Sequence, residues 1–364
     1  MVAKPSTSAN TQLTPREYVS LAAHCTLEVG GPARYLIPAQ DEETVRRAVE
    51  WAEQRALPLR VLGGGSNLVV ADAGVNGLVV KMELRGVDAR ERGGAVEIVA
   101  AAGEPWDDLV RCTVEQGWAG LECLSGIPGL VGATPIQNVG AYGQEVSDTV
   151  RAVRALDRDT GRVLTLSREE CEFAYRTSLF KRRAPDRFVI LEVTYRLTPG
   201  GRPAVRYAEL ERYLADHGVV SPSLADVRRA VLAIRGAKSM VLVPGDPNRR
   251  SCGSFFVNPI LAPDELGRLC RRAGGDSEMP RWPLPGGRVK LSAAWLIERA
   301  GFHKGLREGA VGLSSRHTLA IVCHDGARAA DVVAFARRLR TGVEQQLGLR
   351  LVAEPVLWGP LGLD

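Results

Sequence analysis

Three polar residues stand in sequence surroundings that are otherwise apolar or aromatic, which makes them the first candidates for chemistry. Arg176 follows a Phe-Ala-Tyr segment, Ser254 lies between a glycine and two phenylalanines, and Glu354 interrupts an apolar run near the C-terminus. A charged group in such a place is costly unless it is paired or used. Arg176 and Glu354 therefore either serve a site or form one buried ion pair. Ser254 either serves a site or is a satisfied hydroxyl at the start of a strand, since Cys-Gly-Ser-Phe-Phe does not match the Gly-x-Ser-x-Gly pattern of serine hydrolases.

Two further candidates lie near the ends of predicted helices. Lys238 follows a helix predicted over 224–235, with Arg235 one turn earlier. Positive charge at a helix C-terminus can hold phosphates or can simply complement the helix dipole. Tyr207 opens the preceding helix, predicted over 207–216, where a packing role is an equal alternative.

The stretch 119–143 is the one around which the rest of the chain is organised. It holds six glycines and two prolines in 25 positions and almost no charge. Glycine is favoured where backbone must approach a ligand closely, whereas a core strand would not tolerate this composition. We interpret the stretch as a buried backbone cradle around a large cofactor, with a tight packing loop as the alternative. Its uncharged polar side chains are Ser125, Thr134, Gln137, Asn138 and Tyr142.

A second glycine-rich segment, Gly63-Gly64-Gly65-Ser66-Asn67, follows a strand predicted over 58–62. It is no Rossmann fingerprint, because position 68 is leucine and a strand is expected to follow, and it lacks the Gly-Lys-Ser/Thr of a P-loop. Its backbone N–H groups could still form a nest for a pyrophosphate. A hairpin-like loop is the alternative.

Composition excludes several classes of protein. The chain has 364 residues, 45% hydrophobic and 24% charged residues and a net charge of +5, and its arginine pairs are dispersed rather than clustered with aromatics, so we expect no nucleic-acid binding. Seven scattered cysteines without a Cys-x-x-Cys pair, and histidines without a His-x-x-x-His pair, predict neither disulfides nor a metal site. No apolar run has membrane-spanning length, and the polar start lacks the apolar core of a secretion signal. A cytoplasmic location is therefore expected.

The elements that must position these residues predict an α+β chain. The expected strands are 34–37, 58–62, 68–70, 77–81, 96–101, 150–156, 162–166, 188–197, 254–257, 319–323 and 350–357. The expected helices are 41–55 with Asp41 as N-cap, 105–116 with Pro105 at its first position, 168–171, 207–216, 224–235, 263–271, 293–299 and 329–347. The region 273–288 is predicted to be a mobile loop, and the Pro-Gly-Gly segment at 199–201 is the best boundary between domains.

Seven motifs in order carry a resemblance to a known family. They are Gly63–Asn67, Gly126-Ile127-Pro128-Gly129, Pro135–Gly143, Tyr175-Arg176, Gly253–Pro259, Lys290–Ile297 and Glu354-Pro355. In this order the chain resembles the UDP-N-acetylenolpyruvoylglucosamine reductase family, flavoenzymes of peptidoglycan precursor synthesis. The resemblance runs from about Leu27 to Trp358. It implies an FAD-binding fold of the vanillyl-alcohol-oxidase type with a C-terminal α+β substrate-binding domain.

The resemblance also implies cofactors, substrate and chemistry. FAD is expected to be bound non-covalently and to be reduced by NADPH, and UDP-N-acetylglucosamine enolpyruvate is expected to be reduced to UDP-N-acetylmuramate. Arg176 and Glu354 would polarise the substrate carboxylate and stabilise the enolate-like intermediate, and Ser254 would donate a proton to the neighbouring carbon. Glu354 would need a proton or an intervening hydrogen bond, because two bare carboxylates repel.

The remaining expected contacts divide between the two ligands. FAD contacts are expected at Gly63, Gly64, Gly65, Ser66, Asn67, Ser125, Gly126, Ile127, Pro128, Gly132, Thr134, Gln137, Asn138, Gly140 and Tyr142. Substrate contacts are expected at Tyr175, Tyr207, Lys238 and Asn258, and Tyr207 matches the subclass in which a tyrosine-bearing loop closes over the UDP group. The chain departs from many members at Ser251-Cys252, where Asn-Ala is common, and in a longer 241–250 loop.

The expected organisation is a flexible tail 1–20, an FAD-binding region 21–200 of two α+β subdomains, a substrate-binding domain 201–345, and a terminal segment 346–364 that returns to the active site as a strand. A monomer is expected. Two other functions stay open: another FAD-dependent oxidase of the same fold, which would react with oxygen rather than NADPH, or a flavin-binding module without catalysis.

Overall fold

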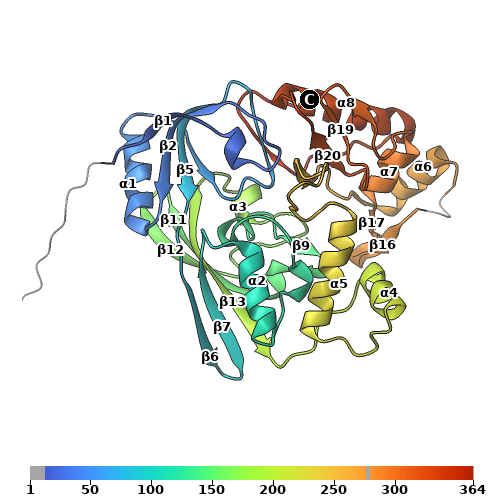
Figure 1. Ribbon diagram of the computed structural model, residues 1–364, viewed down its shortest axis with the longest axis horizontal. Helices are drawn as coiled ribbons and strands as arrows, with labels where there is room; N and C mark the ends of the chain where they lie inside the picture. Colours follow the sequence, from blue (N-terminus) through green and yellow to red (C-terminus); the bar gives the residue numbers. More distant parts are fainter. Residues whose placement is uncertain (1–12, 276–278, 364) are drawn as a thin grey trace, which may run out of the picture.

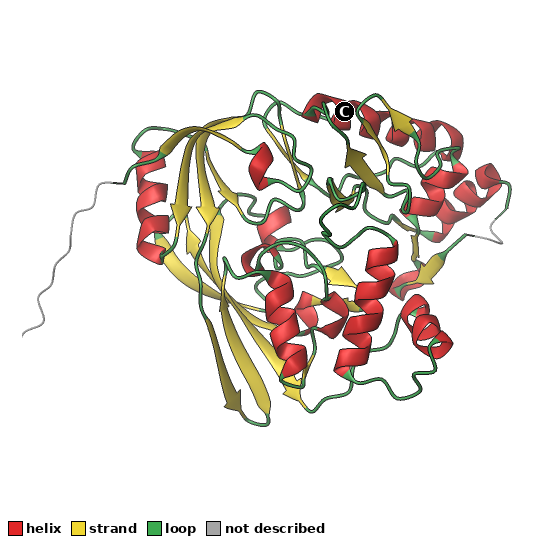
Figure 2. Cartoon of the chain, in the orientation of Figure 1, coloured by secondary structure: helices red, strands yellow, loops and turns green. Residues whose placement is uncertain are grey.

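The computed structural model describes residues 13–275 and 279–363, and its elements form several β-sheets with helices packed against them (Figures 1 and 2). The N-terminal sheet has the strand order β1-β2-β5-β3, with β2 and β3 parallel to β5. Its strands are β1 (Arg16–Ser20), β2 (Pro32–Ala39), β3 (Leu59–Leu62) and β5 (Val75–Met82). Helix α1 (Glu42–Glu53) begins as predicted, because the Asp41 carboxylate accepts a hydrogen bond from the Thr44 amide.

The second sheet is antiparallel and supplies the largest core. Its main order is β12-β11-β13-β7-β6, and β8 also pairs with β13. The strands are β6 (Val87–Arg92), β7 (Ala95–Ala101), β8 (Trp118–Ala119), β11 (Val150–Asp157), β12 (Arg162–Ser167) and β13 (Phe188–Pro199). Helix α2 (Trp106–Glu115) places the fully buried Trp106 beside Tyr195 of β13. The stretch 119–143 runs along this core, so its conformation is held by packing on one side.

The C-terminal part is built on a second antiparallel sheet and three helices. The sheet order is β14-β20-β19-β18, and a smaller sheet has the order β15-β17-β16. The strands are β14 (Ser251–Ser254), β15 (Ile260–Leu261), β16 (Arg281–Pro283), β17 (Val289–Leu291), β18 (Arg307–Glu308), β19 (Val311–Leu313) and β20 (Ala320–Cys323). The helices are α6 (Pro263–Ala273), α7 (Ala293–Arg299) and α8 (Ala329–Leu347).

Between these two parts lie elements that connect them. Helices α4 (Ala208–Asp216) and α5 (Leu224–Ala237) share an apolar cluster with Cys123 of the glycine-rich stretch. Strand β21 (Val356–Trp358) returns across the molecule to pair in parallel with β4 (Leu68–Val70). The end of the chain therefore lies beside the glycine-rich segment 63–67. The short elements are α3 (Leu179–Arg182), β9 (Gly140–Ala141), β10 (Gln144–Glu145) and 3₁₀ turns at Ala22–His24, Glu122–Leu124, Val131–Ala133, Val146–Asp148 and Pro285–Gly287.

Several local predictions are wrong. The helix expected over 168–171 is a turn, because Glu172 takes a left-handed φ of 48° that stops a helix. The strand expected over 254–257 lies earlier, with Ser254 as the last residue of β14. The strand expected over 350–357 is shortened to β21, because residues before Pro355 make only an isolated bridge to the 255–257 segment.

Other corrections concern ends and loops. Pro105 has an extended ψ of 127° and so precedes α2 as its N-cap rather than beginning it. The loop predicted over 273–288 contains β16, while residues 276–278 lie outside the described part. Of the predicted tail 1–20, residues 1–12 also lie outside it, but Arg16–Ser20 form β1, which pairs with β2. Sequence analysis had not predicted β1, β6 or α3.

Candidate active site

The two glycine-rich segments meet and form one backbone surface. Ser66 Oγ donates to the Pro128 carbonyl over 3.0 Å. A Cβ atom on Gly64 would lie 2.8 Å from Gly129 Cα, so only glycine allows the two segments to approach this closely. The predicted cradle is thus a junction between segments that are more than 60 residues apart in the sequence.

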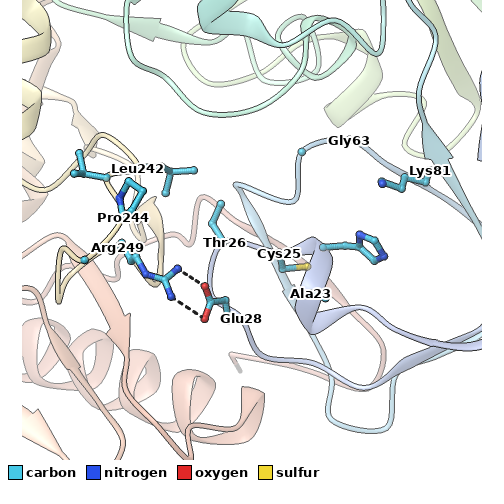
Figure 3. A pocket seen from close by; sticks show the side chains of 13 residues that line it. Ala23, Cys25, Thr26, Glu28, Gly63, Lys81, Leu242, Pro244 and Arg249 are labelled. Atoms are coloured by element: carbon cyan, nitrogen blue, oxygen red, sulfur yellow. Dashed lines mark hydrogen bonds and ion pairs between the residues drawn. The ribbon is translucent and has the colours of Figure 1, made fainter.

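Two hollows open on this junction. One, of about 620 Å³, lies between Gly63-Gly64, the 23–28 segment and the 242–249 loop, with Lys81 and Arg249 on its wall (Figure 3). The other, of about 470 Å³, lies between Gly63-Gly64, Leu130 and the charged segment 81–85. Each has the volume typical of ligand pockets. Backbone that only glycine permits and two adjoining hollows of this volume fit a large cofactor such as FAD, although Lys81 and Arg249 are paired with Glu83 and Glu28 of the same walls.

We expect Gly64→Ala to weaken retention of FAD by at least about tenfold, because the added methyl meets the backbone of Gly129 and pushes the two segments apart. The measurement is FAD content after gel filtration, with binding of added FAD followed by its fluorescence. The matched control is Gly267→Ala in α6, where the new Cβ meets nothing closer than 3.7 Å and alanine should stabilise the helix by roughly 0.5–1 kcal/mol. Unchanged FAD affinity in Gly64→Ala would remove this junction from the cofactor site.

The structure brings Arg176 and Glu354 together. Arg176 Nε lies 3.3 Å from Glu354 Oε1, and Arg176 Nη2 donates to the Gly140 carbonyl over 2.7 Å. Gln137 Nε2 donates to the same Glu354 oxygen over 3.2 Å. Arg176 has a left-handed φ of 53°, which is uncommon for a residue with a side chain and typical of functional sites. From the sequence, Arg176 and Glu354 could form a structural ion pair or serve a site. In the structure they form an ion pair that belongs to a wider cluster of polar groups.

Glu354 is well buried, with 13% of its side chain exposed. Burial raises the pKa of its carboxyl group, while Arg176, Lys181 and the hydrogen bond from Gln137 oppose the rise. Glu354 therefore retains its proton to a higher pH than an exposed glutamate. This supports the expectation that Glu354 could contact a substrate carboxylate without full repulsion between two negative charges.

Ser254 ends β14 beside this cluster. The Glu354 amide donates to the Phe255 carbonyl over 2.9 Å, so the residue after Ser254 is joined directly to Glu354 by the backbone. Ser254 is half-buried, and within the described residues its hydroxyl has no hydrogen-bond partner. The Ser254 hydroxyl is therefore not hydrogen-bonded inside the described part of the protein, as the alternative had required. The free hydroxyl is available to a ligand.

The predicted substrate residues form a second group around aromatic rings. Burial raises the pKa of the Tyr175 phenol, and the neighbouring Asn258 side chain opposes that rise. Tyr207 precedes α4 and lies near the ring of Trp282, with 6.4 Å between centroids and nearly parallel planes. Lys238 is the C-cap residue of α5; its side chain is half-buried and its ammonium group already has a counter-ion in Glu209, at 2.6 Å.

Two residues of this group were missed by sequence analysis. Lys290 Nζ lies 4.9 Å from the Tyr175 ring and 5.3 Å from the Trp282 ring. The signal was present, because Lys290 begins one of the seven motifs, but nothing local distinguished a lysine beside aromatics from a surface lysine. Only the pairing of β16 with β17 places Trp282 opposite Lys290.

Several residues predicted to contact FAD have hydrogen-bond partners inside the protein. Ser125 Oγ donates to the Glu122 carbonyl, Thr134 Oγ1 contacts the Tyr195 hydroxyl at 2.9 Å, and Asn138 Nδ2 donates to Glu145. All three side chains are buried, so they hold the stretch 119–143 in place rather than face the hollows. The reason is that a loop with so little regular structure must satisfy its buried backbone by side-chain hydrogen bonds.

The remaining residues of the stretch 119–143 also differ in what they contact. The Gly126 amide donates to Asp107 over 2.6 Å, and Gly132 packs on Ala102, where a Cβ would come within 2.5 Å. The Tyr142 ring packs edge-on against Tyr207 at 5.6 Å. Ile127 and Pro128 stay near the junction with Ser66, while Gly140 accepts from Arg176. The stretch therefore serves both the junction and the charged cluster.

Comparison with known proteins shows first the class of protein and then the family to which the chain belongs. Residues 32–167 match a family model described as "FAD binding domain", so the chain is a flavoprotein with the FAD-binding fold of the vanillyl-alcohol-oxidase type, as predicted. Residues 246–358 match the model described as "UDP-N-acetylenolpyruvoylglucosamine reductase, C-terminal domain". The chain belongs to the UDP-N-acetylenolpyruvoylglucosamine reductase family.

Individual relatives agree over nearly the whole length. The chain is 49% identical to the UDP-N-acetylenolpyruvoylglucosamine reductase of Thermobifida fusca, over 94% of this chain and 97% of that protein. It is 49% identical to the protein of the same name from Saccharopolyspora erythraea, over 93% and 94%. The crystal structure of the reductase from Thermus caldophilus is similar with a TM-score of 0.67 and 28% identity, over 95% of this chain and all of that one.

Two absences concern the described residues alone. Among residues 13–275 and 279–363, no helix combines the length and the apolar character needed to span a membrane. In the same part of the chain, no group of three or more His, Cys, Asp or Glu side chains is arranged to hold a metal ion.

Proposed function

We propose that this protein is an NADPH-dependent flavin oxidoreductase that reduces the enolpyruvyl ether of UDP-N-acetylglucosamine enolpyruvate to UDP-N-acetylmuramate, a step of peptidoglycan precursor synthesis. The single observation that carries this proposal is the cluster in which Arg176, Glu354 and the segment of Ser254 converge beside the glycine junction. An oxidase of the same fold would have no need for an arginine, a glutamate and a free serine hydroxyl in one place.

The junction of Gly63–Asn67 with Ile127 and Pro128 would hold FAD non-covalently, and the bound cofactor would supply the hydride chemistry that couples oxidation of NADPH to reduction of the vinyl ether. The remaining work belongs to side chains. Arg176 binds the substrate carboxylate and stabilises the negative charge that develops on it. Glu354 accepts a hydrogen bond from Gln137 and pairs with Arg176, so it holds the arginine in place. It also shares the contact with the substrate carboxylate. Ser254 donates the proton to the neighbouring carbon and is re-protonated through water.

The test is oxidation of NADPH by the purified, FAD-loaded protein. Oxidation that depends on UDP-N-acetylglucosamine enolpyruvate, with UDP-N-acetylmuramate as product, is the expected result. Rapid oxidation by molecular oxygen without that substrate would favour the oxidase. A protein that binds FAD but is not reduced by NADPH would favour a flavin-binding module without catalysis.

We further propose that the chain belongs to the subclass in which a tyrosine-bearing loop closes over the UDP group. Support comes from Tyr207, which stands at the entrance of α4 between the rings of Tyr142 and Trp282. Lys238 at the C-terminus of α5 would exchange Glu209 for the diphosphate, and Tyr175 and Asn258 would contact the substrate beside Lys290.

Tyr207→Ala is expected to raise KM for the UDP-sugar substrate by roughly 10- to 100-fold, the loss of about 1–3 kcal/mol of ring contact, with a smaller effect on kcat. The rate of flavin reduction by NADPH should change little. Tyr213→Ala is the matched control, since this tyrosine lies on α4, the helix that Tyr207 precedes, but packs on His217. Equal KM values for wild type and Tyr207→Ala would exclude a role for this tyrosine in closing over the substrate.

The proposed function also implies a division of the chain into domains. We propose an FAD-binding region over 21–200, a substrate-binding domain over 201–345, and a terminal segment 346–364 that carries Glu354 back to the site. A monomer in the cytoplasm is proposed.

A further inference from the structure

Lys181 is a lysine of the charged cluster that neither the motifs nor the proposed roles assign. It lies on α3, the short helix that follows Tyr175-Arg176, and its Nζ donates to Gln137 Oε1 over 3.3 Å. Its neighbours on that helix behave differently: Arg182 and Arg183 are 60% and 65% exposed and both pair with Glu172. Of these basic residues, Lys181 is the one turned toward the cluster.

Gln137 connects Lys181 to Glu354. Its Oε1 atom accepts from Lys181 and, over 3.0 Å, from Asn67 Nδ2, while its Nε2 atom donates to Glu354 Oε1. The oxygen and nitrogen of a glutamine amide are set by the surrounding hydrogen bonds. Asn67 Nδ2 also donates to the Glu354 backbone carbonyl over 3.3 Å, which holds the Asn67 amide as a donor, and the ammonium group of Lys181 can only donate. Lys181 and Asn67 therefore together direct the Gln137 oxygen toward themselves and the Gln137 NH₂ toward Glu354.

The charged groups around Glu354 determine whether its carboxyl group is ionised. The titratable groups that face it are Arg176 and Tyr175 from the turn before α3, Lys181 from α3 and Cys252 from β14. Arg176 and Lys181 favour the ionised carboxylate, whereas burial opposes it. Burial also lowers the pKa of Lys181 itself, and Glu354 counteracts that effect. Lys181 and Glu354 thus each favour the charged form of the other, and the side-chain amide of Gln137 is hydrogen-bonded to both.

We propose that Lys181 is a positioning residue of this site: together with Asn67 it fixes the direction in which Gln137 donates, and together with Arg176 it sets the charge carried by Glu354. The inference rests on the proposed function only for its kinetic consequence, since the hydrogen-bond chain is a property of the protein alone. In the reaction, this charge decides whether Glu354 and the substrate carboxylate can share Arg176. Lys181 acts through Gln137 and is not itself a catalytic residue.

The test compares three variants of Lys181 in the FAD-loaded protein. Lys181→Met removes both the charge and the donor, Lys181→Gln keeps a donor without charge, and Lys181→Arg keeps both. Arg182→Met is the matched control, because it lies on the same helix but pairs with Glu172 at the surface. Protein labelled with ¹³C at the glutamate carboxyl is titrated by NMR, and the Glu354 signal is assigned by its absence in Glu354→Gln.

Removal of a neighbouring positive charge favours the protonated carboxyl, so the Glu354 titration should move to higher pH, by about one unit, in Lys181→Met and Lys181→Gln. Lys181→Arg and Arg182→Met should titrate like the wild type. In the substrate half-reaction, the limb of the pH–rate profile that Glu354 controls should move in the same direction. Lys181→Gln should retain more of the rate than Lys181→Met, because its amide can still donate to the Gln137 oxygen.

Identical Glu354 titrations in Lys181→Met and wild type would overturn the proposal. A shifted titration in protein that lacks NADPH oxidation with the UDP-sugar substrate would instead leave the inference standing and refute the proposed function. Loss of FAD in Lys181→Met but not in Lys181→Arg would make the lysine a cofactor-retaining residue and would also overturn it.

Discussion

Ser254→Ala should slow reduction of the enolpyruvyl substrate by about 10²–10⁴-fold, the usual contribution of a positioned proton donor, while flavin reduction by NADPH keeps its wild-type rate. The reason is the position of the residue: the hydroxyl ends β14, is joined through Phe255 to Glu354, and is left without a partner among the described residues. Removing it deprives the protein of no internal hydrogen bond. Folding and FAD content should therefore remain unchanged.

The measurement separates the two half-reactions by stopped-flow spectroscopy. Flavin bleaching by NADPH is followed first, and the return of flavin colour on addition of the UDP-sugar substrate is followed second. Ser251→Ala, at the other end of the same strand, is the control and should leave both rates near the wild type. Equal losses in both half-reactions of Ser254→Ala would be incompatible with a role in proton donation.

Glu354→Gln should lower the rate of the substrate half-reaction by about 10²–10³-fold, the typical cost of one lost electrostatic contact in a transition state. The amide keeps the size of the side chain and can still accept from Gln137 Nε2, but it cannot pair with the charge of Arg176. FAD content and flavin reduction by NADPH should be retained. Glu344→Gln, on helix α8 away from the site, is the control.

The structural alternative makes the opposite prediction. If Arg176 and Glu354 served only as a buried ion pair, breaking it would leave Arg176 unpaired and would cost about 3–5 kcal/mol of stability. Loss of FAD together with a large fall in Tm in Glu354→Gln would decide for that alternative. Retained FAD with a selective loss of substrate reduction decides for the active site.

Stability should also depend on pH through Glu354. The pKa of its carboxyl is raised in the folded protein, so the folded state binds this proton more tightly than the unfolded state does. The resulting contribution to stability is present below the unfolded pKa and is lost as pH rises through the raised folded pKa. Glu354→Gln removes this pH dependence, and urea unfolding across that pH range would detect its loss.

Local sequence patterns were sufficient for much of the fold. Helices α7 and α8 and strand β4 have the predicted bounds, because each is specified by its own periodicity and its flanking turn residues. The glycine content of 63–67 and 119–143 likewise indicated close backbone approach, and the junction at Gly64 and Gly129 has it. The motifs in order were specific enough to identify the family.

What the tertiary structure alone decided is how these segments meet. Gln137 and Glu354 are 217 positions apart and are joined only because β21 pairs with β4 beside the glycine junction. Ser125 and Thr134 of the same stretch, by contrast, donate to carbonyls three residues before them. Lys181 had no local signature, since a lysine on a short basic helix is ordinarily a surface residue. Propensity and turn chemistry act over a few residues, whereas the burial and partner of a polar group depend on strands brought together by the whole chain.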